Sequence, residues 1–273
     1  MASAPGWFEG TSLNTAVLVP AAGRGERLGP GAPKALRELG DIPMLVHAVR
    51  SLLAARGVTA VVVAAPPDGV AGVRDLLRAR LPAESPVWVV AGGATRQESV
   101  RLALAAVPAD HDIVLVHDAA RPFVPAHVVE AVIAAVADGA DAVVPALPVV
   151  DTVKEVAAAN GAETVVRTVD RSLLRAVQTP QGFRRAVLAR AHAEADGFGA
   201  EGATDDAGMV ERTGGTVVVV PGSEEAFKVT RPFDLLLARA LLERRAEVAE
   251  TVRAGAGDGE SGDAESTEID VVR

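Results

Sequence analysis

Along most of the chain, short apolar runs alternate with longer segments in which apolar residues recur at helical spacing. The short runs are uninterrupted and rich in valine, a pattern typical of strands buried on both faces of a parallel sheet. They lie at residues 16–19, 60–64, 87–91, 113–116, 142–146 and 217–220. The longer segments predict helices at residues 42–55, 70–80, 95–106, 125–137, 184–195 and 230–250. This alternation predicts an α/β fold with a mostly parallel central sheet, built from right-handed crossovers and flanked by helices.

A basic, glycine-rich loop follows the first of these strands, at the carboxyl end where ligands of parallel sheets gather. Gly23 and Gly25 lack the Cβ atoms that would keep backbone N–H groups from converging on an anion. Positive charge comes from three side chains of the loop: Arg24, Arg27 and Lys34. The loop therefore predicts a cradle for a polyphosphate.

Two known phosphate-binding motifs do not fit this loop. The P-loop requires a lysine directly after a glycine, in the register G-x-x-x-x-G-K-[ST], and no lysine of the loop stands there. The dinucleotide fingerprint G-x-G-x-x-G fails because Leu28 replaces its third glycine. Pro30 and Pro33 favour an extended loop over a helix. A plain flexible connection is the alternative to the cradle.

The third predicted strand ends in Gly92 and Gly93. Two adjacent glycines allow the backbone to approach a flat ring closely, and the hydroxyl of Ser99 is a candidate to read a base edge. Thr95 and Glu98 have the spacing of a capping box that begins the next helix, which gives Glu98 a structural role. Taken alone, this segment is a weak indication of a nucleotide site.

Asp118 stands just past the end of the strand at residues 113–116, in the sequence HDAARP. A carboxylate beside a polyphosphate cradle is a natural ligand for Mg²⁺, which prefers oxygen donors and binds proteins through one or two carboxylates. A helix cap and an ion pair with Arg121 are the structural alternatives for Asp118. The five histidines form no pair with metal-ligand spacing, so we expect His117 to make a structural hydrogen bond.

The alternation of strand and helix is interrupted between residues 148 and 170. Residues 149–154 and 164–169 have the pattern of two strands joined by a polar turn at Asn160 and Gly161, which predicts an inserted β-hairpin arm. A lone hairpin cannot bury both of its faces. We therefore expect the arm to pack against a second subunit, and folding back onto its own domain is the alternative.

Two later segments carry weaker signals. Asp205 and Asp206 have the position of residues that cap a helix, where the helix dipole favours acids. Residues 227–230, which include Lys228, have the pattern of a short last strand.

The length of 273 residues is enough for one large α/β domain. We expect that domain at residues 15–250, between an N-terminal extension at residues 1–14 and an acidic, disordered tail at residues 251–273. No apolar run reaches the roughly 18 residues of a membrane helix, and the first ten residues lack the basic start and apolar core of a secretion signal. The chain has no cysteine, which excludes disulfides, thiolate nucleophiles and cysteine zinc sites. These observations favour a cytoplasmic protein with no membrane partner.

The net charge of −9 is concentrated at the carboxyl end of the chain. Residues 255–273 hold six acids and one arginine, a net of −5, which leaves −4 for the rest. This mildly acidic body argues against nucleic acid as a partner. Only three of the 27 cationic residues are lysines. Because lysine and arginine differ at phosphates, Lys34 and Lys228 are candidates for phosphate contacts, whereas chance explains Lys154 equally well.

Taken together, several short motifs resemble the 2-C-methyl-D-erythritol 4-phosphate cytidylyltransferases of the non-mevalonate isoprenoid pathway. In chain order they are PAAGRGERL with Pro33 and Lys34, GGATRQESV, HDAARP, VDTVK, TVDR, TPQ, TDDAGMVE and KVTRP. The resemblance spans residues 16–242, and the order and spacing of the whole set carry its specificity. It implies a Rossmann-like nucleotidyltransferase fold and a homodimer that exchanges its arms. It also implies a reaction in which CTP and methylerythritol 4-phosphate give a CDP-alcohol and pyrophosphate.

The resemblance also implies roles for individual residues. Arg27 and Lys34 would stabilise the transition state, and Lys228 would add positive charge near the reacting phosphates. Asp118 would bind substrate and hold Mg²⁺. The nucleotide would be bound by six small residues: Ala21, Ala22, Gly23, Gly92, Gly93 and Ser99.

The arm would contribute to the neighbouring subunit's site, where Thr152 and Arg171 would contact the sugar phosphate. At one position the chain departs from part of the family: Ala94 stands where some members carry an acid, so that side-chain contact near the base is absent.

Three other functions remain as alternatives. A sister enzyme with the same fold and nucleotide but another acceptor, such as ribitol 5-phosphate, would differ mainly in the arm. A non-catalytic nucleotide-binding regulator would have little need of the metal carboxylate and the cations that this chain retains. A dehydrogenase is disfavoured by the missing third glycine.

Overall fold

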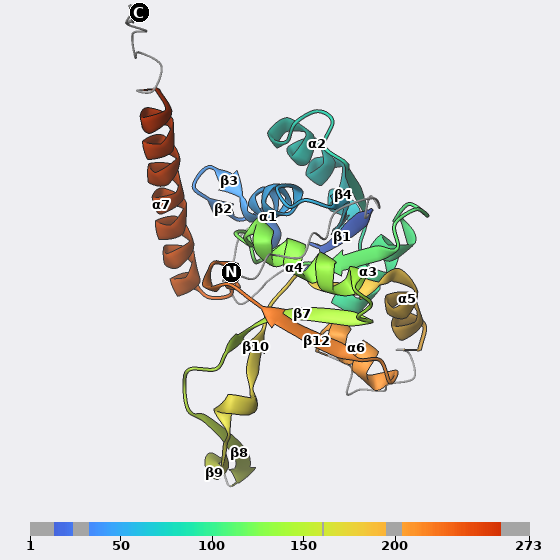
Figure 1. Cartoon of the computed structure of the whole chain (residues 1–273), viewed down its shortest axis with the longest axis vertical. Coiled ribbons are helices and arrows are strands. Elements are labelled where there is room, and N and C mark those ends of the chain that lie inside the picture. Colours follow the sequence, from blue (N-terminus) through green and yellow to red (C-terminus); the bar gives the residue numbers. More distant parts are fainter. Residues whose placement is uncertain (1–13, 24–32, 160, 195–203, 258–273) are drawn as a thin grey trace, which may run out of the picture.

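The computed structural model describes residues 14–23, 33–159, 161–194 and 204–257. Its centre is an eight-stranded sheet with the order β10-β7-β11-β6-β1-β4-β5, and β12 pairs with β7 outside this path (Figure 1). The strands of this sheet are β1 (Thr15–Pro20), β4 (Val58–Ala65), β5 (Val87–Ala91), β6 (Ile113–Val116), β7 (Ala142–Pro148), β10 (Arg175–Val177), β11 (Gln181–Arg184) and β12 (Val217–Pro221). The α-helices are α1 (Met44–Leu53), α2 (Val70–Arg80), α3 (Arg96–Ala105), α4 (Ala126–Ala137), α5 (Arg185–Glu194), α6 (Asp206–Arg212) and α7 (Pro232–Gly257).

Strand β1 lies at the centre of the sheet and is parallel to its neighbours β4 and β6. Its side chains alternate between two hydrophobic cores, as strand geometry requires. Val17 and Val19 pack with residues of α1, α2 and α4, whereas Ala16 and Leu18 pack with residues of α3, α5 and α6. Because helices cover both faces, the strand is apolar throughout. The predicted parallel sheet flanked by helices is confirmed.

Two strands of the sheet, β10 and β11, were not predicted. Strand β11 lies between β6 and β7 and is antiparallel to both. Its sequence, QGFR, contains no β-branched residue, although Phe183 is fully buried. Gly182 is required there because an added Cβ would lie 2.4 Å from Val132 Cγ1 of α4. The other strand, β10, pairs antiparallel with β7.

Several predicted elements differ in the structure. The helix expected from residue 42 begins at Met44, because β3 (Ile42–Pro43) pairs with β2 (Glu38–Leu39). The strand expected at residues 227–230 is wrong. Those residues follow a 3₁₀ turn in an irregular conformation that is fixed to the core by a hydrogen bond from Val229 N–H to Ala120 O (2.8 Å). Helix α7 continues past residue 250, into the segment expected to be disordered, and residues 258–273 lie outside the described ranges.

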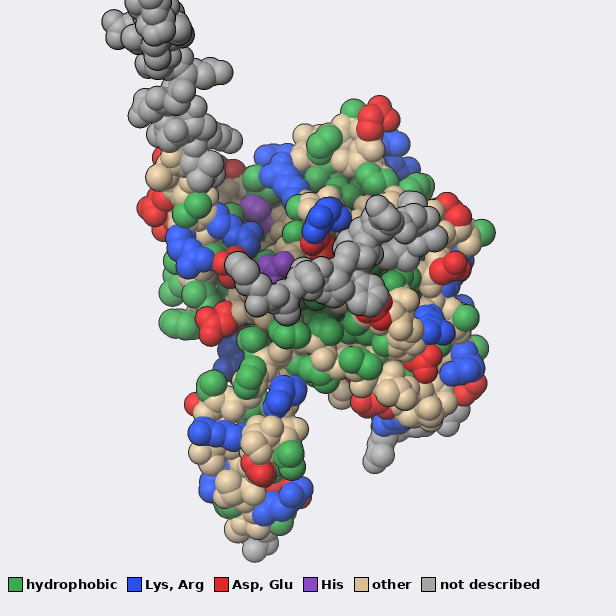
Figure 2. Space-filling model, viewed as in Figure 1, with side chains coloured by type: hydrophobic (Ala, Val, Ile, Leu, Met, Phe, Trp, Pro, Cys, Tyr) green, Lys and Arg blue, Asp and Glu red, His purple; other side chains and the backbone are tan. Residues whose placement is uncertain are grey.

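The predicted arm is present as the antiparallel hairpin of β8 (Val153–Ala159) and β9 (Ala162–Val169), although its first strand was expected at residues 149–154 and lies further along the chain. It projects from the body of the molecule as a separate lobe (Figures 1 and 2). The residues of β9 before Val169 are all exposed, among them Val165 and Val166. The hairpin therefore does not fold back onto its own domain. Over the residues that the structure describes, no helix combines the length and apolarity needed to cross a bilayer.

Candidate active site

The carboxyl ends of β1 and β6 open into a hollow of about 250 Å³. Its lining comes from segments far apart in the sequence: Pro20, Ala21, Gly23, Lys34, Ala35, Arg96, Asp118, Ala119, Ala120 and Lys228. The described ends of the cradle and the HDAARP segment thus line one site, as sequence patterns predicted. A larger hollow of about 660 Å³ lies between α2 and β5, but the described residues that line it include no acid or histidine.

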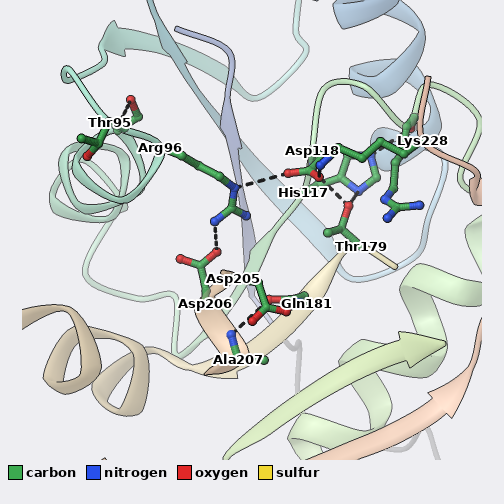
Figure 3. Close-up of polar contacts among 12 residues, drawn as sticks. Thr95, Arg96, His117, Asp118, Thr179, Gln181, Asp205, Asp206, Ala207 and Lys228 are labelled. Carbon is green, nitrogen blue, oxygen red and sulfur yellow. Dashed lines mark hydrogen bonds and ion pairs between the residues drawn. The ribbon is translucent and has the colours of Figure 1, made fainter. Parts of the chain in front are cut away.

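The Asp118 carboxylate lies in this hollow with 13% of its side chain exposed. Lys228 Nζ lies 2.6 Å from its Oδ2 atom, and Arg96 Nε lies 3.4 Å from its Oδ1 atom (Figure 3). Burial alone would raise the pKa of Asp118, but the positive charges of Arg96 and Lys228 outweigh it and hold that pKa well below its usual range. The site therefore presents an ionised carboxylate between two cations.

Neither structural alternative for Asp118 is observed. The residue does not cap a helix, because α4 begins eight residues later with Pro125 at its N-cap. The guanidinium of Arg121 donates instead to the carbonyl oxygens of Ala226 (2.6 Å) and Val177 (3.3 Å). Arg121 thereby ties the HDAARP segment to the chain that precedes Lys228.

His117 makes the structural hydrogen bonds that were expected of it. Its Nε2 atom donates to Arg121 O at 3.0 Å, because a carbonyl oxygen can only accept, so Nδ1 accepts from Thr179 Oγ1 at 3.2 Å. The same Thr179 hydroxyl accepts from Asp118 N–H at 3.0 Å. Burial lowers the pKa of His117 to about 4, so the ring is neutral at neutral pH. This chain of bonds fixes the backbone that carries Asp118.

The glycine loop after β5 packs directly against the loop after β1. An added Cβ on Gly92 would lie 2.7 Å from Ala22 Cβ, closer than real Cβ atoms approach, and 3.0 Å from Ser99 Oγ. The Ser99 hydroxyl is buried, donates to Thr95 O (2.9 Å) and accepts from Gly93 N–H (3.1 Å). In this arrangement Ser99 shapes the loop from inside, and its role as a base-reading residue stays a prediction.

Gly92→Ala is expected to raise the KM for a nucleotide about tenfold, because the loops after β1 and β5 must separate to admit the methyl group. Steady-state kinetics with a titrated nucleotide measures this. Gly72→Ala is the matched control, since nothing lies within 4 Å of its added Cβ and it stands inside α2. That control is expected to keep the KM and to stabilise the protein by about 1 kcal/mol. An unchanged KM in Gly92→Ala contradicts the expected packing.

The predicted capping residues are largely confirmed. Glu98 N–H donates to Thr95 Oγ1 (3.1 Å) at the start of α3, but the Glu98 carboxylate accepts from Ala94 N–H (2.8 Å) and not from Thr95. Asp205 caps α6 by accepting from Gly208 N–H (2.9 Å). Asp206 does not act as a cap, and it is fully buried.

The remaining predicted site residues fall into three places. Lys34 lines the hollow at the start of the 3₁₀ turn Lys34–Leu36. Arg27 lies outside the described residues. Thr152 and Arg171 belong to the arm and its base, where Arg171 donates to Val150 O. Among the described residues that line the hollow of the same chain, neither arm residue is present.

Sequence reasoning missed Arg96, which is the first residue of α3 and reaches both Asp118 and Asp206 (Figure 3). A signal was available: a cation in the first turn of a helix opposes the helix dipole, so it needs an acidic partner elsewhere. The described residues contain no group of three or more acids, histidines or cysteines placed to hold a metal. Asp118 is the one carboxylate among the described residues that line the hollow, and its binding of Mg²⁺ stays a prediction.

The comparison with known families decides between the candidate functions. The model of the 2-C-methyl-D-erythritol 4-phosphate cytidylyltransferase family matches residues 15–244. The chain belongs to this cytidylyltransferase family. The family member from Streptomyces coelicolor is 63% identical over 235 residues, covering 85% of this chain and 86% of that protein. The one from Streptomyces avermitilis is 62% identical over 239 residues, covering 86% of this chain and 94% of that protein.

A solved cytidylyltransferase of the family has the same fold. The crystal structure of the 2-C-methyl-D-erythritol 4-phosphate cytidylyltransferase from Thermus thermophilus matches with a TM-score of 0.65 and 41% sequence identity. The match covers 83% of this chain and 97% of that structure. The Rossmann-like nucleotidyltransferase fold expected from the sequence is thus confirmed.

Proposed function

We propose that this protein joins CTP and 2-C-methyl-D-erythritol 4-phosphate to give 4-diphosphocytidyl-2-C-methyl-D-erythritol and pyrophosphate, in isoprenoid precursor biosynthesis. The observation that carries the proposal is the family match over residues 15–244, which includes the whole hollow. The hollow supplies what the reaction needs: the cations Lys34, Arg96 and Lys228 beside the Asp118 carboxylate. A cytoplasmic location is proposed with it.

The chemistry requires cations more than it requires a base. A phosphate monoester is mostly dianionic near neutral pH, with a second pKa of about 6, so its oxygen attacks the α-phosphorus of CTP without giving up a proton to the protein. The new oxygen–phosphorus bond forms as the bond to the β-phosphate oxygen breaks, and pyrophosphate leaves. The step therefore needs no base, and His117, which is buried and hydrogen-bonded on both nitrogens, does not act as one.

Positive charge must bring two anions together and stabilise the charge that develops at phosphorus. In this proposal, Arg27 and Lys34 stabilise the transition state, and Lys228 contacts the reacting phosphates. Asp118 would hold Mg²⁺, which neutralises phosphate charge when bound. Both oxygens of Asp118 face a cation, and each keeps a second lone pair through which it could hold the metal.

The nucleotide is proposed to bind across the two glycine loops that touch at Ala22 and Gly92. Small residues leave room for backbone N–H groups to face the ligand. The six residues proposed for this surface are Ala21, Ala22, Gly23, Gly92, Gly93 and Ser99.

The exposed arm supports a homodimer in which Thr152 and Arg171 enter the site of the partner subunit. A two-stranded hairpin is at best marginally stable in isolation, and this one carries exposed valines, including Val156 and Val165. Covering these side chains with a second copy would remove apolar surface from water.

Subunit complementation tests the exchanged arms. Lys34→Ala and Arg171→Ala chains, each with its own tag, are co-expressed and the mixed dimer is purified. One of its two sites then combines an intact cradle with an intact arm, so it is expected to recover about half of the wild-type activity per dimer. The control pairs Lys34→Ala with the Lys34→Ala, Arg171→Ala double variant, whose mixed dimer contains no intact site. Equal, low activity in both preparations argues that each arm serves its own chain.

The acceptor is tested by release of pyrophosphate from CTP with magnesium chloride and one candidate acceptor at a time. We expect rapid release with methylerythritol 4-phosphate and slow release with ribitol 5-phosphate. The opposite order assigns the chain to a sister activity. CTP binding without turnover of any acceptor favours the non-catalytic regulator.

A further inference from the structure

Asp206 is a fully buried carboxylate that the proposed mechanism has not used. A buried charge is costly unless it is paired, and Asp206 has two partners. Arg96 Nη1 lies 2.6 Å from its Oδ2 atom, and His192 Nε2 lies 3.1 Å from its Oδ1 atom. Burial would raise the pKa of Asp206, but the His192 hydrogen bond and the charge of Arg96 lower it below its ordinary value. Asp206 is therefore an anion held inside the protein.

Helix capping does not explain this buried anion. The neighbouring Asp205 provides the cap of α6, and its second oxygen accepts from Gln181 Nε2 at 2.6 Å. Gln181 Oε1 in turn accepts from Ala207 N–H at 3.1 Å. The start of α6 is thus fixed to β11 without the Asp206 carboxylate (Figure 3).

Arg96 connects this anion to the hollow. The guanidinium is planar and its donors are fixed relative to one another, so holding one edge sets the direction of the other. Nη1 is held by Asp206, and Nε points to Asp118 Oδ1, 3.4 Å away. Arg96 also lies in the first turn of α3, where the helix dipole repels a cation. Asp206 offsets that repulsion and keeps the guanidinium at the wall of the hollow.

We propose that Asp206 is a positioning residue whose buried ion pair with Arg96, supported by His192, holds the Arg96 guanidinium where it contacts the phosphates of CTP. The inference rests on the proposed function, because it takes CTP as the ligand. Arg96 would keep Asp206 as its anchor even if Asp118 were engaged by a metal. The cation is therefore already in place before CTP arrives, which lowers the ordering cost of binding.

The test compares Asp206→Asn with Asp205→Asn, two adjacent carboxylates changed in the same way. Asparagine keeps the size of Asp206 and can still accept from His192, but it removes the charge that holds Arg96. CTP binding is measured by calorimetry with magnesium chloride and no acceptor, and KM is measured for each substrate. We expect Asp206→Asn to weaken CTP binding and raise the KM for CTP about tenfold, with the KM for the acceptor within twofold of wild type. Asp205→Asn is still a good cap but gives up the bond from Gln181 Nε2, because an amide nitrogen cannot accept; it is expected to lose some stability and to stay within twofold in CTP binding and in both KM values.

A second variant guards against loss of folding in Asp206→Asn. Arg96→Lys keeps the positive charge on a side chain that is 36% exposed, but lysine lacks the fork that reaches both carboxylates. Arg96→Lys is expected to weaken CTP binding about tenfold. Adding Asp206→Asn to Arg96→Lys should change CTP binding less than twofold further, because both substitutions remove the same interaction between the two side chains. Unchanged CTP binding in Arg96→Lys overturns the inference, and so do losses that multiply in the double variant.

The outcomes also separate this inference from the proposed function. If wild type and Asp205→Asn turn over CTP while Asp206→Asn matches them, only the positioning role is wrong. If wild type releases no pyrophosphate with any acceptor, but the Asp206→Asn variant binds CTP less tightly than wild type does, the positioning role holds and the proposed reaction is wrong.

Discussion

Lys34→Ala is expected to lower kcat about a hundredfold with CTP saturating, which corresponds to about 3 kcal/mol of lost transition-state stabilisation. Lys34 lines the hollow beside Asp118 and Lys228, where charge would develop in the proposed reaction. A preorganised cation contributes most when that charge is greatest, so the loss should appear in kcat more than in KM. Arg27→Ala is expected to have an effect of similar size.

Steady-state kinetics at saturating CTP and acceptor measures this fall in kcat. Arg101→Ala is a suitable control, because Arg101 is an exposed cation of α3 that does not line the hollow. It is expected to keep kcat within twofold. Full turnover by Lys34→Ala would refute the assignment of this lysine to the transition state.

Asp118→Asn is expected to lower kcat at least about a hundredfold and to raise the magnesium concentration needed for half-maximal activity. Asparagine keeps the shape of the side chain but removes the charge that lies 2.6 Å from Lys228 and 3.4 Å from Arg96. Two cations then face each other across the hollow without an anion between them, and a metal loses its carboxylate donor.

A magnesium titration of the reaction rate, together with circular dichroism to check folding, separates these effects. Asp138→Asn changes an exposed acid at the C-cap of α4 and serves as the control, with both rate and magnesium dependence expected to match wild type. If Asp118→Asn keeps the wild-type magnesium dependence and only kcat falls, the carboxylate orients Lys228 and Arg96 but does not bind the metal.

Sequence patterns predicted most of the sheet because its parallel strands are buried on both faces. An uninterrupted apolar run such as IVLV in β6 is typical of a strand buried on both faces. Strand β5 and helix α2 likewise have the predicted bounds. The chemistry of the strand ends was also accessible. A carboxylate just after β6 and glycines just after β5 stand at positions fixed by the local sequence.

Sequence patterns failed where distant contacts decide the structure. Strand β11 is held by its neighbours β6 and β7, so its own sequence carries little signal. The residues around Lys228 resemble a strand because apolar residues flank the lysine, but Val229 is buried in a cluster with Leu39 and Phe123 and not by sheet pairing. Asp206 has the sequence context of a cap, and only the fold brings Arg96 to it.

The insertion of β11 between β6 and β7 has a consequence for the order in which the newly made chain can fold. Strands β1, β4, β5 and β6 have all left the ribosome once residue 116 emerges, and they already pair with one another. Strand β7 pairs with β10, β11 and β12, all of which are translated later. The first half of the sheet can therefore assemble during synthesis, while β7 waits unpaired for the following residues. A nascent chain stalled before residue 181 would expose the edge of β6 and be prone to aggregate.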